Sequence, residues 1–322
     1  MNNMETTFTQ YVNNKIKLQF SQYEHSVIYG QNIVAGSRIS GLGSQLEEIK
    51  GVTTINSTNS ENSLMGLGLG LAISNIPSMF MMKQHDFALL GIDQLTNTTN
   101  VLRKDRFLAP LIILMVVVDS GYEGPQASLS SLDEFASLVR APVHFLSTIE
   151  NIDLAFKNAE SPGLHFMALS QKNMKKSVGN SLKVSSFFEE AILYKEEESK
   201  NKQSKTCLVF YGIEISFIEE VVVRSKIEDI SYDIILISKL SRIEKESKLF
   251  SQLSSYEKII IIDTGKSEIH FSSELAWQLK MNGKNVFKFQ RKSSDNWSKV
   301  TADELEFKVE EVVSFVQKGT ID

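Results

Sequence analysis

The sequence predicts an α/β protein of two domains, each a mainly parallel sheet covered by helices. Three observations support this prediction. A chain of 322 residues is too long for one small core and has the length of two domains of ordinary size. Short apolar runs alternate with segments of helical periodicity. Several of those runs show no polar alternation, which is typical of strands that helices cover on both faces.

The first domain is expected at residues 21–170, after an N-terminal extension at 1–20. Its strands are expected at residues 27–30, 52–58, 78–82, 110–118, 143–148 and 163–169. Its helices are expected at residues 64–74, 86–103, 131–139 and 152–160.

Residues 171–204 are predicted to link the two domains, because they are polar, charged and weakly periodic around one amphipathic patch, "FFEEAILY". The second domain, of the same class, is expected at residues 205–322. Its strands are expected at residues 207–212, 233–238, 258–265 and 285–290. Its helices are expected at residues 218–223, 274–283 and 305–319.

Composition excludes several functional classes. A net charge of -5 provides no basic excess to neutralise phosphates, so we expect no general nucleic-acid binding. The single cysteine, Cys207, excludes an internal disulfide framework and any cysteine-based zinc site. That cysteine usage suits a reducing cytoplasm. The N-terminal residues lack the apolar core of a signal peptide, so a cytoplasmic protein is expected.

The run from Ser63 to Met82 approaches the ~20 residues that a transmembrane helix needs. Ser74, Asn75 and Pro77 interrupt it, and its glycines weaken an isolated span. We therefore expect no membrane segment, but a buried helix followed by a buried strand.

The stretch "GLGLG" at residues 66–70 suggests a dinucleotide-binding loop, yet Leu71 stands where the third glycine of that fingerprint belongs. The glycines are also expected inside the helix, where a pyrophosphate could not reach the helix N-terminus. Packing is the alternative. Gly66 and Gly70 lie one turn apart, and they would allow another backbone to approach closely.

Glu61 is the single charge at the start of this apolar region. A carboxylate in the first turn of a helix is stabilised by the helix dipole, so Glu61 has a purely structural explanation. The neighbouring residues, however, are apolar or small over more than twenty positions. A carboxylate kept out of water among them is also a candidate for proton transfer.

The next segment, "HDFALLGIDQLTN" at residues 85–97, also has two interpretations. It is either an amphipathic helix capped by Asp86 with Phe87 in the core, or an aromatic and polar face beside Glu61. The second arrangement would suit a cofactor with an aromatic ring.

Three segments in order carry a resemblance to a known family. They are "VIYGQNIVAGSRISGLGSQL", "TNSENSLMGLGLGLAISNIPSMF" and "HDFALLGIDQLTN". Together they resemble the pyrimidine-binding domain of thiamine-diphosphate enzymes, in particular the beta subunit of 2-oxo acid dehydrogenases. Split transketolase C-terminal subunits and deoxyxylulose-phosphate synthase show a similar pattern. The later segment "IIIIDTGKSEIHFSSELAWQL" resembles the transketolase C-terminal domain, so the resemblance covers nearly the whole chain after residue 20.

The resemblance implies roles for individual residues. Glu61 matches the glutamate that bonds the pyrimidine ring nitrogen and promotes the imino tautomer, and Phe87 matches the aromatic residue that stacks on the ring. It also places Gln31 and Leu64 beside the cofactor. The implied activity is transfer or decarboxylation of a two-carbon or acyl unit from a 2-oxo acid or ketose through an enamine intermediate.

The sequence departs from the family pattern at three points. Gln31 replaces an acidic residue, and Ala127 stands where the family has a catalytic histidine. His85 is a candidate substitute for that histidine, whereas His144, His165 and His270 are interpreted as structural. No GDG motif for the diphosphate and its metal occurs in the chain. The resemblance therefore implies an obligate alpha-like partner that holds the diphosphate and Mg²⁺, in an alpha2beta2 heterotetramer.

Three functions stay open at this point. The first is the pyrimidine-binding beta subunit of a heteromeric thiamine-diphosphate enzyme, active only with its alpha chain on a small-molecule substrate. The second is a split transketolase subunit acting on sugar phosphates. The third is a catalytically silent subunit with a structural or regulatory role. No metal ligand is expected in this chain, and the sequence names neither donor nor acceptor, nor does it settle lipoyl transfer.

Overall fold

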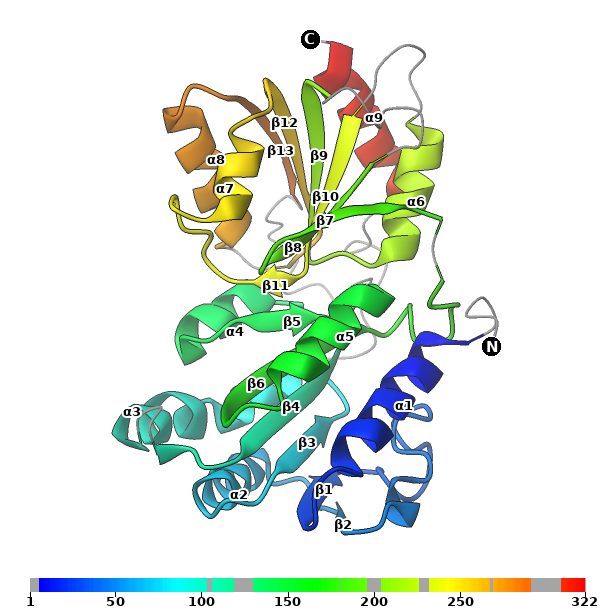
Figure 1. The fold of residues 1–322 in the computed structure, drawn as a ribbon, viewed down its shortest axis with the longest axis vertical. Coiled ribbons are helices and arrows are strands. Elements are labelled where there is room, and N and C mark those ends of the chain that lie inside the picture. Colours follow the sequence, from blue (N-terminus) through cyan, green and yellow to red (C-terminus); the bar gives the residue numbers. More distant parts are fainter. Residues whose placement is uncertain are drawn as a thin grey trace, which may run out of the picture. The chain divides into compact units, whose positions relative to one another are not determined.

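The structure is a computed structural model with two compact units. It describes residues 6–102, 106–118, 130–179, 181–195, 204–225, 232–266, 269–290 and 308–321. Among these, the first unit contains the residues between 6 and 118 and between 135 and 179, and the second contains residues 130–134 and those from 181 onward. Figure 1 shows that each unit is a sheet with helices packed on it.

The first unit is built on a parallel sheet, in the order β5-β6-β4-β3-β1-β2. Every residue of β3 and β4 is buried, which agrees with strands covered by helices on both faces. The strands are β1 (Ser26–Gly30), β2 (Val52–Asn56), β3 (Ser78–Met82), β4 (Pro110–Val117), β5 (Val143–Phe145) and β6 (Gly163–Ser170).

Helices form where apolar residues recur every three or four positions. In α1, Phe8, Val12, Ile16 and Phe20 are buried along one face, and a Thr7–Gln10 capping box begins the helix. The helical elements of this unit are α1 (Phe8–Phe20), η1 (Leu46–Glu48), α2 (Glu61–Ile73), η2 (His85–Gly91), η3 (Gln94–Thr98), α3 (Thr99–Leu102), α4 (Leu132–Val139) and α5 (Ile149–Asn158). The first three residues of α4 belong to the second unit.

The second unit has a sheet in the order β13-β12-β9-β10-β8-β7. Its first four strands are parallel, whereas β8 and β7 pair antiparallel with their neighbours. The strands of this sheet are β7 (Val184–Phe187), β8 (Ala191–Tyr194), β9 (Thr206–Tyr211), β10 (Tyr232–Ile237), β12 (Lys258–Asp263) and β13 (Asn285–Gln290). The unit also contains the two-residue strand β11 (Lys239–Leu240), which is not part of this sheet.

Helices lie on both sides of this second sheet, α7 and α8 on one and α6 and α9 on the other (Figure 1). They are α6 (Ile215–Arg224), α7 (Lys248–Leu253), α8 (Phe271–Met281) and α9 (Val309–Ile321). Two mainly parallel sheets covered by helices confirm the predicted fold class.

Three regions differ in detail from the expected elements. The N-terminal extension predicted at 1–20 contains α1, and the linker predicted at 171–204 contains β7 and β8, the latter fully buried. The segment 86–103, expected as one helix, is a 3-10 turn, a π turn and a short α-helix. Gly91 ends the 3-10 turn, and a side chain there would overlap Met65 of α2, so close packing shapes this segment.

Among the described helices, none has the length and apolarity needed to cross a bilayer.

Candidate functional site

The carboxyl ends of β1 and β3 meet at one edge of the first sheet. The two strands are parallel neighbours, and the order β2-β1-β3-β4 means that the chain leaves β1 toward one side and returns on the other. In open α/β sheets, ligands bind outside the carboxyl ends of the strands at such a switch point. A small pocket lies there, and it is lined by Gln31, Glu61, Phe80, Met81, Met82, Lys83 and Phe87.

Glu61 is the first residue of α2, and Ser60 before it makes no side-chain cap. Despite its place at a helix end, Glu61 exposes only 7% of its surface. The side-chain amide of Gln31 donates a hydrogen bond to its Oε1 at 3.1 Å. The other carboxylate oxygen, Oε2, accepts no hydrogen bond from the described part of the chain. The Glu61 carboxyl group is therefore buried, with Oε1 bonded to Gln31 and Oε2 without a hydrogen bond from the described chain.

Apolar side chains form the rest of the pocket. Phe87 is half-buried in η2, while Met81 and Met82 at the end of β3 are buried. The pocket leaves about 10 Å³ for the centre of a water-sized sphere, enough for about one water molecule. The chain thus supplies an acid, an aromatic ring and an apolar wall, but not an enclosed cavity for a ring-sized ligand.

The structure brings together Gln31, Glu61 and Phe87 of the predicted site residues, but neither Leu64 nor His85 lines this pocket. Leu64 is half-buried, and its carbonyl oxygen accepts a hydrogen bond from the Tyr29 hydroxyl at 3.0 Å. His85 is completely buried, with its ring edge-to-face against Phe135 at 5.3 Å between centroids.

The glycines of "GLGLG" lie inside α2, which excludes the phosphate-binding interpretation, since no helix begins there. The close approach predicted at Gly66 and Gly70 is not found within the described chain. A Cβ at Gly70 would meet nothing within 4 Å, and one at Gly66 would meet only the Gln94 side chain at 3.6 Å. Gly68 is the tightly packed position, because a Cβ there would overlap the Tyr29 hydroxyl.

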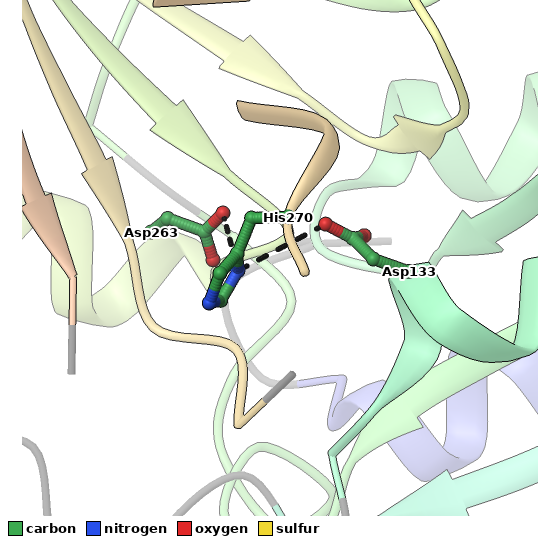
Figure 2. Close-up of side chains that lie close together, drawn as sticks. All are labelled: Asp133, Asp263 and His270. Carbon is green, nitrogen blue, oxygen red and sulfur yellow. Dashed lines mark ion pairs between the residues drawn. The ribbon is translucent and has the colours of Figure 1, made fainter. Parts of the chain in front are cut away.

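A second cluster of ionisable side chains lies within the second unit. Asp263 is the last residue of β12, His270 precedes α8, and Asp133 is in the first turn of α4. His270 Nδ1 is 3.1 Å from Asp263 Oδ2 and 3.9 Å from Asp133 Oδ2, and Figure 2 shows the three side chains converging. Within the described residues, this is the one grouping of histidine, cysteine and acidic side chains that could ligate a metal ion.

Burial and mutual charge shift the pKa values of these groups. Burial, together with the charge of Asp263, raises the pKa of Asp133 to about 7. Burial also opposes ionisation of Asp263, but His270 and the hydrogen bonds from Ser272 and Gly265 outweigh it, so the Asp263 pKa lies below its ordinary value. Burial lowers the pKa of His270, but the interaction with Asp263 exceeds that effect and the pKa is raised.

The sequence did not predict this cluster, and His270 was interpreted as structural. Asp263 ends the apolar run "KIIIID", and an acid at the carboxyl end of a buried strand is the signal that was present. Asp133 gave none, because it comes together with Asp263 and His270 only in the folded chain. Ala127, predicted to replace the family histidine, lies outside the described residues.

No protein-family model and no curated protein matches the sequence. Solved structures do match its fold. A structure described as "split gene transketolase, inactive beta4 tetramer" aligns with a TM-score of 0.64 and 13% identity, over 97% of each chain. A transketolase from Campylobacter jejuni aligns with a TM-score of 0.63 and 15% identity, over 95% of this chain and 46% of the other.

The third match is 2-oxoglutarate:ferredoxin oxidoreductase from Magnetococcus marinus, solved with 2-oxoglutarate, coenzyme A and succinyl-CoA bound. It aligns with a TM-score of 0.60 and 10% identity, over 96% of this chain and 64% of the other. At identities of 10–15%, these matches establish a shared transketolase-like fold.

Proposed function

We propose that this chain is the pyrimidine-binding subunit of a heteromeric thiamine-diphosphate-dependent enzyme. The enzyme would transfer or decarboxylate a two-carbon or acyl unit from a 2-oxo acid or a ketose. One observation supports the proposal most strongly. The buried Glu61 carboxyl group has one oxygen without a hydrogen bond from the described chain, and it lines a pocket with Phe87 at the switch point of a transketolase-like sheet.

The residues of the pocket fit an aminopyrimidine ring. Glu61 Oε2 would hold or exchange a proton at a ring nitrogen, while Gln31 orients the carboxyl group through Oε1. Phe87 provides an aromatic face, and Met81 and Met82 exclude water on the side of β3. Thiamine diphosphate, when bound, supplies the carbon nucleophile for the reaction. The predicted contribution of Leu64 stays part of the proposal, as does proton transfer by His85.

The proposal requires a second chain. The pocket is too small to enclose a ring, and the one grouping of described residues that could ligate a metal belongs to the second unit. The diphosphate and Mg²⁺ would therefore be held by an alpha-like partner. A surface for that partner exists on α2. Leu67 and Ile73 expose 40% and 37% of their surface there, and a Cβ added at Gly70 would meet no described atom beyond its own helix backbone within 4 Å. An alpha2beta2 assembly would cover this apolar face.

A split transketolase acting on sugar phosphates is the second candidate. The observation that favours it is the alignment with the split-gene transketolase chain over 97% of both chains. The two candidates differ in substrate: a ketose phosphate for this one, and a 2-oxo acid for the dehydrogenase-like enzyme.

The test is to co-express the chain with the protein encoded beside it, purify the complex and measure thiamine diphosphate binding. Turnover is then assayed on a panel of 2-oxo acids and ketose phosphates. Glu61→Gln should lower turnover by on the order of 10²–10⁴, as expected when a proton-transfer group is lost, while the complex still assembles. Glu257→Gln is the control, because the Glu257 side chain is 68% exposed and, within the part of the chain that the structure describes, pairs with Lys205 alone. Unchanged turnover in Glu61→Gln would contradict the proposal.

A further inference from the structure

The second sheet has a switch point of its own. The chain passes from β9 through α6 to β10 on one side, and then returns to β12 on the other side of β9. Asp263 and Tyr211 are the last residues of β12 and β9, and they are paired in register at this edge. By the rule that applies to the first sheet, the carboxyl edge at β9 and β12 is where a ligand is expected. The Asp133, Asp263 and His270 side chains meet there.

These three side chains are almost completely removed from solvent. Asp133 exposes 8% of its side chain, and Asp263 and His270 expose 3% each. One ligand atom from each lies within 4.8 Å of the other two. All three belong to the same compact unit.

Ordinary hydrogen bonds explain the positions of the two carboxylates. The Phe271 backbone N–H donates to Asp133 Oδ2 at 2.9 Å, which places this acid at the N-terminus of α8. The Gly265 N–H donates to Asp263 Oδ1 at 2.9 Å, and the Ser272 hydroxyl donates to Oδ2. These bonds hold both carboxylates in place without the imidazole.

The imidazole itself is not explained by such bonds. His270 Nδ1 is fully buried and pairs with Asp263 Oδ2 at 3.1 Å, but among the described residues it makes no aligned hydrogen bond. Two atoms that share a hydrogen bond point at each other, whereas two ligands of one ion both point at a third position. The misaligned Nδ1 beside two carboxylates matches the second arrangement.

We propose that Asp133, Asp263 and His270 form a binding site for a divalent first-row transition ion, such as Zn²⁺. The imidazole ligand disfavours Mg²⁺ and Ca²⁺, which prefer oxygen, and the absence of a thiolate suits a borderline ion. Two carboxylates with a neutral imidazole carry two negative charges, which a divalent ion balances inside the protein.

The distances are compatible with this ion. Zinc bonds of about 2.0–2.2 Å place two ligand atoms about 3.0–3.4 Å apart, depending on geometry. The His270–Asp263 separation of 3.1 Å already fits, and Asp133 would move toward His270 by about 0.5 Å.

The test uses the full chain, freed of metal with a chelator and then titrated with Zn²⁺ alone. We expect one equivalent of tight Zn²⁺ per chain, a higher thermal midpoint in its presence, and no competition from excess Mg²⁺. His270→Gln should weaken Zn²⁺ binding by on the order of 100-fold, and Asp133→Asn should act in the same direction. The matched control is His25→Gln, because His25 lies 3.9 Å from Glu24 in an exposed pair.

If the His270 variant does not fold, the wild-type chain still decides the question. Co²⁺ bound in this site would give a visible absorption band that Zn²⁺ abolishes at one equivalent. Uptake of less than one equivalent by the wild type, or equal loss in His25→Gln and His270→Gln, would overturn the proposal. Neither the Zn²⁺ titration nor the Co²⁺ absorption involves thiamine diphosphate or turnover. Failure of the metal-site proposal is therefore distinguishable from failure of the proposed function.

Discussion

Gly68 and Gly70 allow the same substitution to be compared in two environments on one helix. In Gly68→Ala the new methyl group would overlap the Tyr29 hydroxyl and lie 2.7 Å from Leu111 Cδ1. Tyr29 and Leu111 are completely buried, so relief requires repacking, at a cost of about 1–3 kcal/mol. Displacing the Tyr29 hydroxyl from the Leu64 carbonyl costs about 1 kcal/mol more.

Alanine is favoured over glycine in a helix by about 1 kcal/mol, and this gain applies at both positions. Gly68→Ala should therefore lower the free energy of unfolding by about 1–3 kcal/mol. Gly70→Ala, with nothing within 4 Å of the new Cβ, should raise it by up to about 1 kcal/mol. The isolated chain thus gives a difference in the free energy of unfolding between the variants of roughly 1–4 kcal/mol.

Urea unfolding of the two variants, followed by circular dichroism, measures this difference. A third variant identifies its cause. Tyr29→Phe removes the hydroxyl that the new methyl group would overlap, so in that background Gly68→Ala should cost about 1 kcal/mol less. If Gly68→Ala is as stable as Gly70→Ala, or if Tyr29→Phe leaves its cost unchanged, the packing argument for α2 is wrong.

Three further predictions concern single side chains. His85→Ala should lower the free energy of unfolding in urea by about 2–4 kcal/mol, because it leaves a cavity beside Phe135. The predicted catalytic role of His85 additionally requires that the variant lose turnover, measured per folded complex. Burial holds the pKa of His165 below its ordinary value despite the Ser161 carbonyl, so the folded chain binds this proton less readily than the unfolded chain. Stability should fall as the pH drops below about 6.5, and His165→Gln should flatten that dependence in unfolding measured down to about pH 5. Gly283 has a φ of 76°, in the left-handed region where a Cβ is strained. Gly283→Ala should therefore lower the free energy of unfolding by about 1–2 kcal/mol and lower the thermal midpoint, and Gly283→Asn should lower both by less.

Much of the fold was predictable because its strands are buried on both faces. Runs such as residues 110–118 and 258–263 are apolar without alternation, and they became the fully or almost fully buried β4 and β12. The short strands β7 and β8 were missed because they lie in a polar region. Antiparallel pairing of β8 with β10 and of β7 with β8, rather than a long apolar run, defines them. The helix α1 was missed although its apolar residues recur every fourth position.

The candidate site was predictable only in part. A lone acid before an apolar helix indicated the burial of Glu61, but its contact with Gln31 joins residues 30 positions apart. Within the described chain no backbone approaches Gly66 or Gly70 closely, and their packing against a partner helix stays a prediction. The three glycines lie within five residues and look alike in the sequence until neighbouring side chains surround them. Gly68 alone faces Tyr29 and Leu111.

Local patterns in the sequence were enough to establish most of the strands and helices, the burial of the sheets and the isolated acid at the start of α2. These features depend on periodicity and composition over a few residues, which the chain carries before it folds. Strand order is different, because it results from contacts between distant segments across the whole unit. Folding therefore placed both switch points, the Gln31–Glu61 contact and the meeting of Asp133 with Asp263 and His270.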